Sequence, residues 1–118
     1  MPSYLILIYG DEQRWNAMSP DEEQQIHEGH RAFQKMAGAA VRAVGELESS
    51  TTAVTLRRGA EARPMVSDGP FLESKEVVGG FYLVDAADRD EVVSYASNLA
   101  EAVHDHSGVE IIPLLNRG

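Results

Sequence analysis

The sequence of 118 residues contains no cysteine, which excludes disulfide bonds, thiolate metal ligands and cysteine nucleophiles. Basic residues are also scarce, because 10 Lys and Arg stand against 19 Asp and Glu and leave a net charge of −9 at pH 7. Such a surface repels phosphate backbones, so we expect no nucleic-acid partner. No apolar run approaches the roughly 20 residues that cross a bilayer, and the N-terminus has no signal-peptide pattern. We therefore expect a cytoplasmic protein with no membrane partner.

The remaining composition is that of one folded domain over residues 1–118. Hydrophobic residues make up 43% and charged residues 25%, which is the balance of a globular chain rather than a disordered one. No repeat, low-complexity segment or linker divides the sequence.

Hydrophobic periodicity predicts a strand followed by a long helix. Residues 4–9 form a short apolar run typical of a buried strand. Ser19, Pro20 and Glu22 then mark a helix start, with Ser19 as the cap and Glu22 completing a capping box. Apolar residues recur at helical spacing over residues 26–44, which predicts an amphipathic helix of about six turns with Gly38 inside it.

The second half of the sequence predicts strands over residues 51–58, 63–67, 81–84 and 109–115, and a helix that starts at Asp88 and carries an apolar stripe to Val103. Two helices on one face of an antiparallel sheet make a ferredoxin-like α+β domain with a split βαβ arrangement. The other face of the sheet is also apolar in this pattern. We therefore expect a homodimer that forms through the sheet face.

Two motifs resemble a known family. Asp-Gly-Pro-Phe-Leu-Glu-Ser-Lys-Glu at residues 68–76, followed by Gly-Gly-Phe-Tyr-Leu-Val-Asp at residues 79–85, closely resembles the signature of the YCII-related family in its DGPF branch. The segments 4–10 and 108–113 are similar to that family as well. The resemblance implies a ferredoxin-like subunit of the dimeric α+β barrel group.

His30 is the leading candidate for a chemical role. It lies on the apolar stripe, one turn from both Ile26 and Phe33, so its imidazole faces the sheet. It is either a general base or a core histidine bonded to a neighbouring strand. The resemblance implies a His-Asp pair in the cleft between helix and sheet, and His30 and Asp68 are the positions that match it. Asp68 precedes a Gly-Pro step, so it orients the histidine, caps its own turn, or does both.

Other side chains have two interpretations each. Tyr9, Phe71 and Tyr82 would form apolar walls with polar tips around a substrate. Lys75 either binds an anionic ligand or belongs to a solvated charged stretch. Trp15, in the first loop, is either a lid over a cleft or a plug at the edge of the core.

We expect no metal site and no cofactor. The triplet at residues 104–106, His-Asp-His, is predicted to cap a helix end at the surface, because metal sites normally gather ligands from several elements.

Two classes of function remain open. In the first, the protein is a cofactor-free isomerase or lyase that moves a proton on a small organic substrate, with His30 as base and Asp68 as its partner. The barrel group that the resemblance implies contains such enzymes, for example muconolactone isomerase. In the second, it is a non-catalytic ligand-binding or regulatory dimer with a functional link to an extracytoplasmic-function sigma factor. A solvent-connected cleft at His30 near Asp68 favours the first, and an imidazole sealed in apolar packing counts against it.

Overall fold

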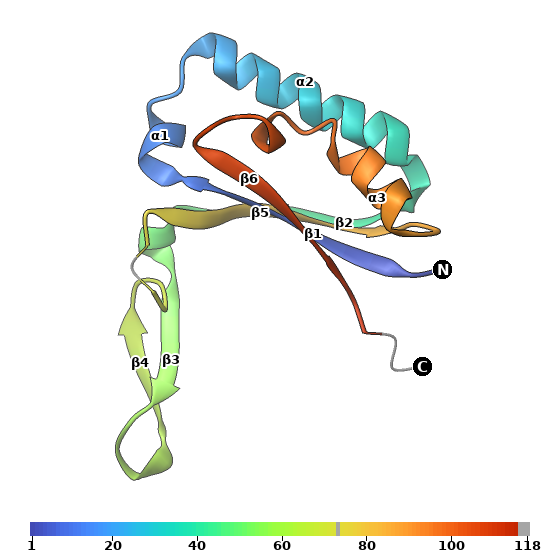
Figure 1. Ribbon diagram of the computed structural model, residues 1–118. Coiled ribbons are helices and arrows are strands. Elements are labelled where there is room, and N and C mark those ends of the chain that lie inside the picture. Colours follow the sequence, from blue (N-terminus) through green and yellow to red (C-terminus); the bar gives the residue numbers. More distant parts are fainter. Residues whose placement is uncertain (73, 116–118) are drawn as a thin grey trace.

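In the computed structural model, which describes residues 1–72 and 74–115, helices cover one face of a four-stranded sheet and a two-stranded hairpin projects from the other side (Figure 1). The strands are β1 (Ser3–Asp11), β2 (Val41–Glu46), β3 (Val54–Arg58), β4 (Pro64–Asp68), β5 (Glu76–Asp85) and β6 (Ser107–Pro113). The α-helices are α1 (Glu12–Asn16), α2 (Pro20–Ala37) and α3 (Arg89–Ala96). Short 3₁₀ turns are η1 (Gly38–Ala40), η2 (Ser50–Thr52), η3 (Ala60–Ala62) and η4 (Ala100–Ala102).

The strand order β2-β5-β1-β6, with every neighbouring pair antiparallel, confirms the predicted ferredoxin-like α+β fold. β1 and β2 are joined through α2 and flank β5, which is the split βαβ arrangement. The hairpin of β3 and β4 is an insertion between β2 and β5. No helix in the described part of the chain has the length and apolar content to cross a membrane.

The predicted start of α2 is confirmed, but its predicted end is wrong. The Ser19 hydroxyl accepts a hydrogen bond from the Glu22 amide at 3.2 Å. The helix ends at Ala37, where Gly38 takes a φ of +53° that side chains disfavour. Val44 therefore lies in β2 and not on the helix. Alternating apolar residues just after the helix match helical spacing by coincidence, because a strand also presents every second residue to one face.

The second predicted helix is also shorter than expected. Asp88 caps α3 through a 2.9 Å hydrogen bond from the Glu91 amide, as predicted. The helix ends at Ala96, so Leu99 is buried from an irregular segment while Val103 is 82% exposed. The segment between β1 and α2 was predicted to be an irregular loop, but it contains the short helix α1. The Asp11 side chain caps this helix by accepting from the Gln13 and Arg14 amides.

The core lies between the sheet and the helices α2 and α3. Phe33 of α2 is completely buried and its ring centroid lies 4.2 Å from that of Tyr82 on β5. Around this pair pack other fully enclosed apolar side chains, among them Ile6, Val84, Val92 and Leu99.

The turn after β4 has the conformation that its glycine predicts. Gly69 has a φ of +96°, and its amide donates to the Ala53 carbonyl at 2.7 Å. The side chain of Asp68, by contrast, makes no hydrogen bond to the described part of the chain, so its predicted bonds to local amides are not found. Glu73, within the same motif, lies outside the described residues.

Candidate functional site

A cleft of about 690 Å³ opens between α2 and the edge of the sheet formed by β2 and β5. α3 and η4 pack near the opposite edge, so α2 covers this half of the sheet without them, with α1 at one end (Figure 1). The helix does not cover this half of the sheet completely. Val44 pairs with Tyr82 and lies on the same, helix-facing side, yet it is 57% exposed. Ile26, His30 and Gln34 line the cleft from the helix.

His30 links two buried side chains at the inner end of this cleft. Its Nδ1 lies 2.6 Å from the Tyr82 hydroxyl, and its Nε2 lies 2.8 Å from Oε2 of Glu101. The side chain of Glu101 is 7% exposed and that of His30 is 25% exposed, while Tyr82 is buried. The three residues come from three elements, α2, β5 and η4, and all of them line the cleft.

The direction of the hydrogen bonds follows from the chemistry of the partners. An ionised carboxylate only accepts, so Nε2 of His30 carries the proton and donates it to Glu101. Nδ1 then has a free electron pair, which accepts the hydrogen of the Tyr82 hydroxyl. The arrangement resembles a catalytic triad in which a carboxylate orients a histidine and the histidine faces a hydroxyl.

The environment of Tyr82 keeps its hydroxyl protonated. Burial raises the pKa of Tyr82, the negative charge of Glu101 raises it further, and Gln34 acts in the opposite direction. At neutral pH the phenol is therefore a hydrogen-bond donor to His30 and not a phenolate.

Gly29 allows α2 to come close enough to η4 for this contact. A β-carbon at position 29 would lie 2.7 Å from the Asn98 carbonyl oxygen and 2.8 Å from the Ala100 nitrogen. Any side chain there would push away the segment that carries Glu101. The close approach next to His30 therefore depends on a glycine in the helix interior.

Trp15 forms a fixed wall of the cleft. Its indole lies on two glycines, since a β-carbon on Gly10 or Gly79 would fall 2.2 or 2.5 Å from the ring. The indole Nε1–H donates to the Ser107 hydroxyl at 2.8 Å. The ring also packs against the core, so in this structure Trp15 is held on the sheet.

The predicted partner Asp68 does not reach His30 within this chain. Asp68 ends β4, which belongs to the separate two-stranded sheet (Figure 1). It pairs with Val54 and is exposed. The carboxylate beside His30 is that of Glu101 instead. The reason is that the hairpin carries residues 54–68 away from the helix-covered face of the main sheet.

Of the predicted substrate-binding residues, Tyr82 alone lines this cleft. Tyr9 borders a second, shallower hollow, and Phe71 is 62% exposed with the Arg57 guanidinium 4.6 Å from its ring centroid. Lys75 is exposed and lies 3.7 Å from a carboxylate oxygen of Asp11. The arginine of the cleft wall is Arg31.

Two buried polar residues were not anticipated from the sequence. Glu101 had no signal, because the helix predicted to run past residue 100 would place it on a solvated side. His106 was expected at the surface in the triplet 104–106, yet its side chain is 3% exposed and bonded to Glu22. The surface interpretation is wrong for His106.

This chain is similar to known proteins over nearly its whole length. The family profile of the YCII-related domain matches residues 3–114, which include all six strands and His30, Tyr82 and Glu101. An uncharacterised protein of Rhizobium meliloti (strain 1021) is 35% identical over 113 residues, which cover 94% of this chain and 90% of that protein.

Proposed function

Since this chain belongs to the YCII-related family, we propose a function that the residues of its cleft support: proton transfer on a small organic substrate by an isomerase or lyase that needs no cofactor. The observation that carries this proposal is the chain of hydrogen bonds from Glu101 through His30 to Tyr82, at 2.8 and 2.6 Å. The motif at residues 68–71 further suggests the DGPF branch of the family, and we retain a cytoplasmic location as part of the proposal.

The proposed step is a relay of two protons. The Tyr82 oxygen takes a proton from a carbon of the substrate while its own proton passes to Nδ1 of His30. The imidazolium that forms keeps its Nε2–H on the Glu101 carboxylate, whose negative charge stabilises it. The relay then runs backwards and returns the proton to another atom of the substrate. The result is an isomerisation, or an elimination if a leaving group takes the proton.

The walls of the cleft suggest the class of substrate. Ile8, Ile26 and Val44 provide apolar surface on the helix-facing side, and Arg31 provides a guanidinium. A guanidinium binds carboxylates through paired hydrogen bonds. We therefore propose a substrate with a small apolar body and a carboxylate. Arg31, and not Lys75, is the proposed carboxylate-binding residue, because Arg31 lines the cleft and Lys75 does not.

A deuterium-exchange experiment tests the relay. Wild-type protein in D₂O, with a panel of enolisable keto acids and unsaturated lactone acids, should exchange the acidic C–H of at least one compound, as followed by proton NMR. Tyr82→Phe removes the hydroxyl and should slow the exchange by about 100-fold or more, the range of general acid–base catalysis. Glu101→Gln should slow it too. Tyr95→Phe is the matched control, because this tyrosine packs in the core outside the cleft wall.

Exchange that is equally fast in Tyr82→Phe would contradict the relay. The alternative is a non-catalytic ligand-binding or regulatory dimer linked to an extracytoplasmic-function sigma factor. One feature favours it: both nitrogens of His30 already have partners within the chain. It would be preferred if compounds of the panel shift the NMR signals of cleft residues while no compound exchanges.

We also propose that the protein is a homodimer through the open sheet face. Leu5, Leu7, Phe81, Leu83 and Ile112 all lie on the side opposite the helices and are partly exposed. Burying this face against a second copy would remove about 2,000 Å² of surface. Light scattering at micromolar concentration should therefore give about twice the 12.9 kDa of one chain. Leu7→Glu should give monomers, whereas Val93→Glu, on the helix side, should not. A wild-type monomer would overturn the proposal.

A further inference from the structure

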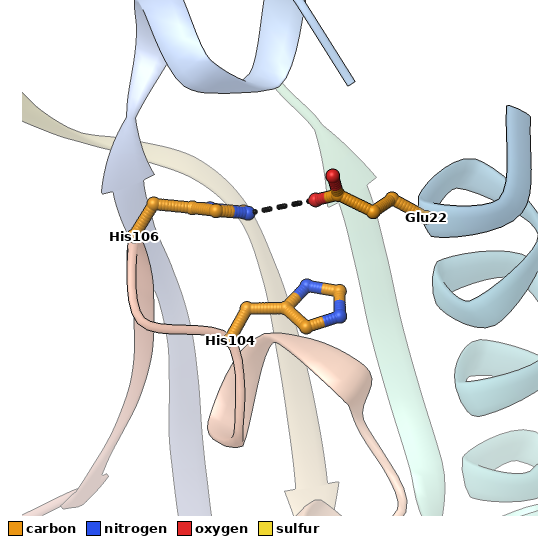
Figure 2. A group of neighbouring side chains, drawn as sticks. All are labelled: Glu22, His104 and His106. Atoms are coloured by element: carbon orange, nitrogen blue, oxygen red, sulfur yellow. Dashed lines mark hydrogen bonds and ion pairs between the residues drawn. The ribbon is translucent and has the colours of Figure 1, made fainter. Parts of the chain in front are cut away.

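A second cluster of ionisable side chains lies outside the cleft wall, where the first turn of α2 meets the loop before β6. Glu22, His104 and His106 each offer one ligand atom, and these atoms all lie within 4.8 Å of one another (Figure 2). In the described part of the chain, none of the three lines the cleft at His30. The triplet 104–106 that the sequence placed at the surface thus turns two imidazoles toward a helix.

His106 is held rigidly in this cluster. Its Nε2 lies 3.1 Å from Oε2 of Glu22, and its Nδ1 lies 2.8 Å from the Ser107 hydroxyl. The same hydroxyl accepts the Trp15 indole N–H, which leaves it one more electron pair and one hydrogen. Because the Glu22 carboxylate accepts, Nε2 of His106 carries the proton and Ser107 donates to Nδ1. Rotation of the hydroxyl would let Ser107 accept from Nδ1 instead, which the other neutral form of the ring needs.

His104 has an unpaired ligand atom that points into the cluster. Its Nε2 lies 3.1 Å from the amide oxygen of Gln25, which only accepts, so Nε2 carries the proton. Nδ1 then has a free electron pair, and it is buried without a partner among the described residues. Figure 2 shows a ring nitrogen of His104 turned toward the His106–Glu22 pair. A buried acceptor without a donor is unfavourable, and a cation would satisfy it.

We propose that Glu22, His104 and His106 bind a divalent transition-metal ion of the zinc type. Two imidazoles and one carboxylate are a ligand set that zinc favours, and the fourth position would be open to water. With metal–ligand distances of about 2.0–2.2 Å, tetrahedral ligand atoms lie about 3.3 Å apart. Nε2 of His106 and Oε2 of Glu22 are already 3.1 Å apart, so only His104 has to move closer.

The groups around the cluster match what a metal requires of its surroundings. Zinc on Nε2 of His106 requires the ring proton on Nδ1, where the free electron pair of Ser107 accepts it, so no net proton is released by this ring. Gln25 holds His104 in the form whose Nδ1 is free. The ion would tie the start of α2 to the loop before β6 and would stabilise the folded state.

Zinc binding can be measured directly. Protein treated with a chelator and then dialysed should bind one zinc per chain in calorimetric titration with zinc chloride, and zinc should raise its unfolding temperature. Glu22→Gln and His104→Ala should each weaken binding by about tenfold or more. His27→Ala is the matched control, because this histidine is exposed on α2 outside the cluster, and it should bind zinc as wild type does.

Three results would overturn the site: no saturable binding, equal affinity in wild type and Glu22→Gln, or an equal loss in the His27→Ala control. Glu22→Gln keeps the size of the side chain, so it remains informative even where His104→Ala fails to fold. Cobalt provides a second readout, because tetrahedral coordination by nitrogen and oxygen gives strong visible absorption that should disappear in Glu22→Gln. The outcome is independent of the exchange experiment at His30.

Discussion

Replacing His30 with alanine is expected to destabilise the protein by about 3–5 kcal/mol, because the substitution leaves the buried carboxylate of Glu101 without a partner. Glu101 is 5% exposed, and its Oε1 already lacks a partner among the described residues. Without the Nε2–H of His30, its Oε2 would lose the hydrogen bond that now holds it at 2.8 Å. Urea denaturation followed by circular dichroism measures the loss.

Comparison variants separate this charge effect from the loss of packing. Glu101→Gln should cost clearly less than His30→Ala, because a neutral amide is easier to bury and its oxygen still accepts from Nε2. Adding Glu101→Gln to His30→Ala should recover part of the lost stability. His27→Ala, an exposed histidine on the same helix, should change stability by no more than about 0.5 kcal/mol. A cost below about 1 kcal/mol for His30→Ala would show that Glu101 is neutral or solvated.

Phe33→Ala is expected to have an effect of similar size, about 3–5 kcal/mol, through packing alone. The side chain is completely buried between α2, α3 and the sheet. Its ring lies 4.2 Å from that of Tyr82 and 6.5 Å edge-on from that of Tyr95, measured between centroids. Alanine would leave a cavity beside both tyrosines, and the loss would appear as a lower urea midpoint.

Phe33→Ala should also affect the cleft, because Tyr82 contacts both regions. Tyr82 packs against Phe33 with its ring and bonds His30 with its hydroxyl, so a cavity at position 33 lets the phenol move. Phe33→Leu fills most of the space and should cost only about half as much. If Phe33→Ala were as stable as Phe33→Leu, the ring would not be the central packing element that the structure indicates.

Local structure was determined largely by the sequence. The caps at Ser19 and Asp88 and the positive φ at Gly69 were all predictable, because each depends on a few neighbouring residues and their backbone preferences. The order of strands and helices was sufficient for the α+β fold as well, since few topologies let two helices cover one face of an antiparallel sheet.

The ends of the helices were decided by tertiary structure. Val44 fits a helical stripe as well as a strand, and the local stop signal between them is Gly38, a residue that a helix interior also accepts at a cost of about 1 kcal/mol. Pairing with Tyr82 on β5 selects the strand, because hydrogen bonds along a whole edge outweigh a small difference in local preference.

The two candidate sites also depend on contacts far apart in the sequence. His30 was identified from its position on the apolar stripe, but its partner Glu101 lies 71 residues away, in a segment expected to be solvated. Glu22 and His106 meet across 84 residues. Such pairs leave no periodic pattern, because they form only where a helix end and a loop are packed against each other. The sequence therefore determined which helix carries the candidate histidine. The packing of α2 against η4 and against the loop before β6 determined that Glu101 lies beside His30 and that Glu22 lies beside His106.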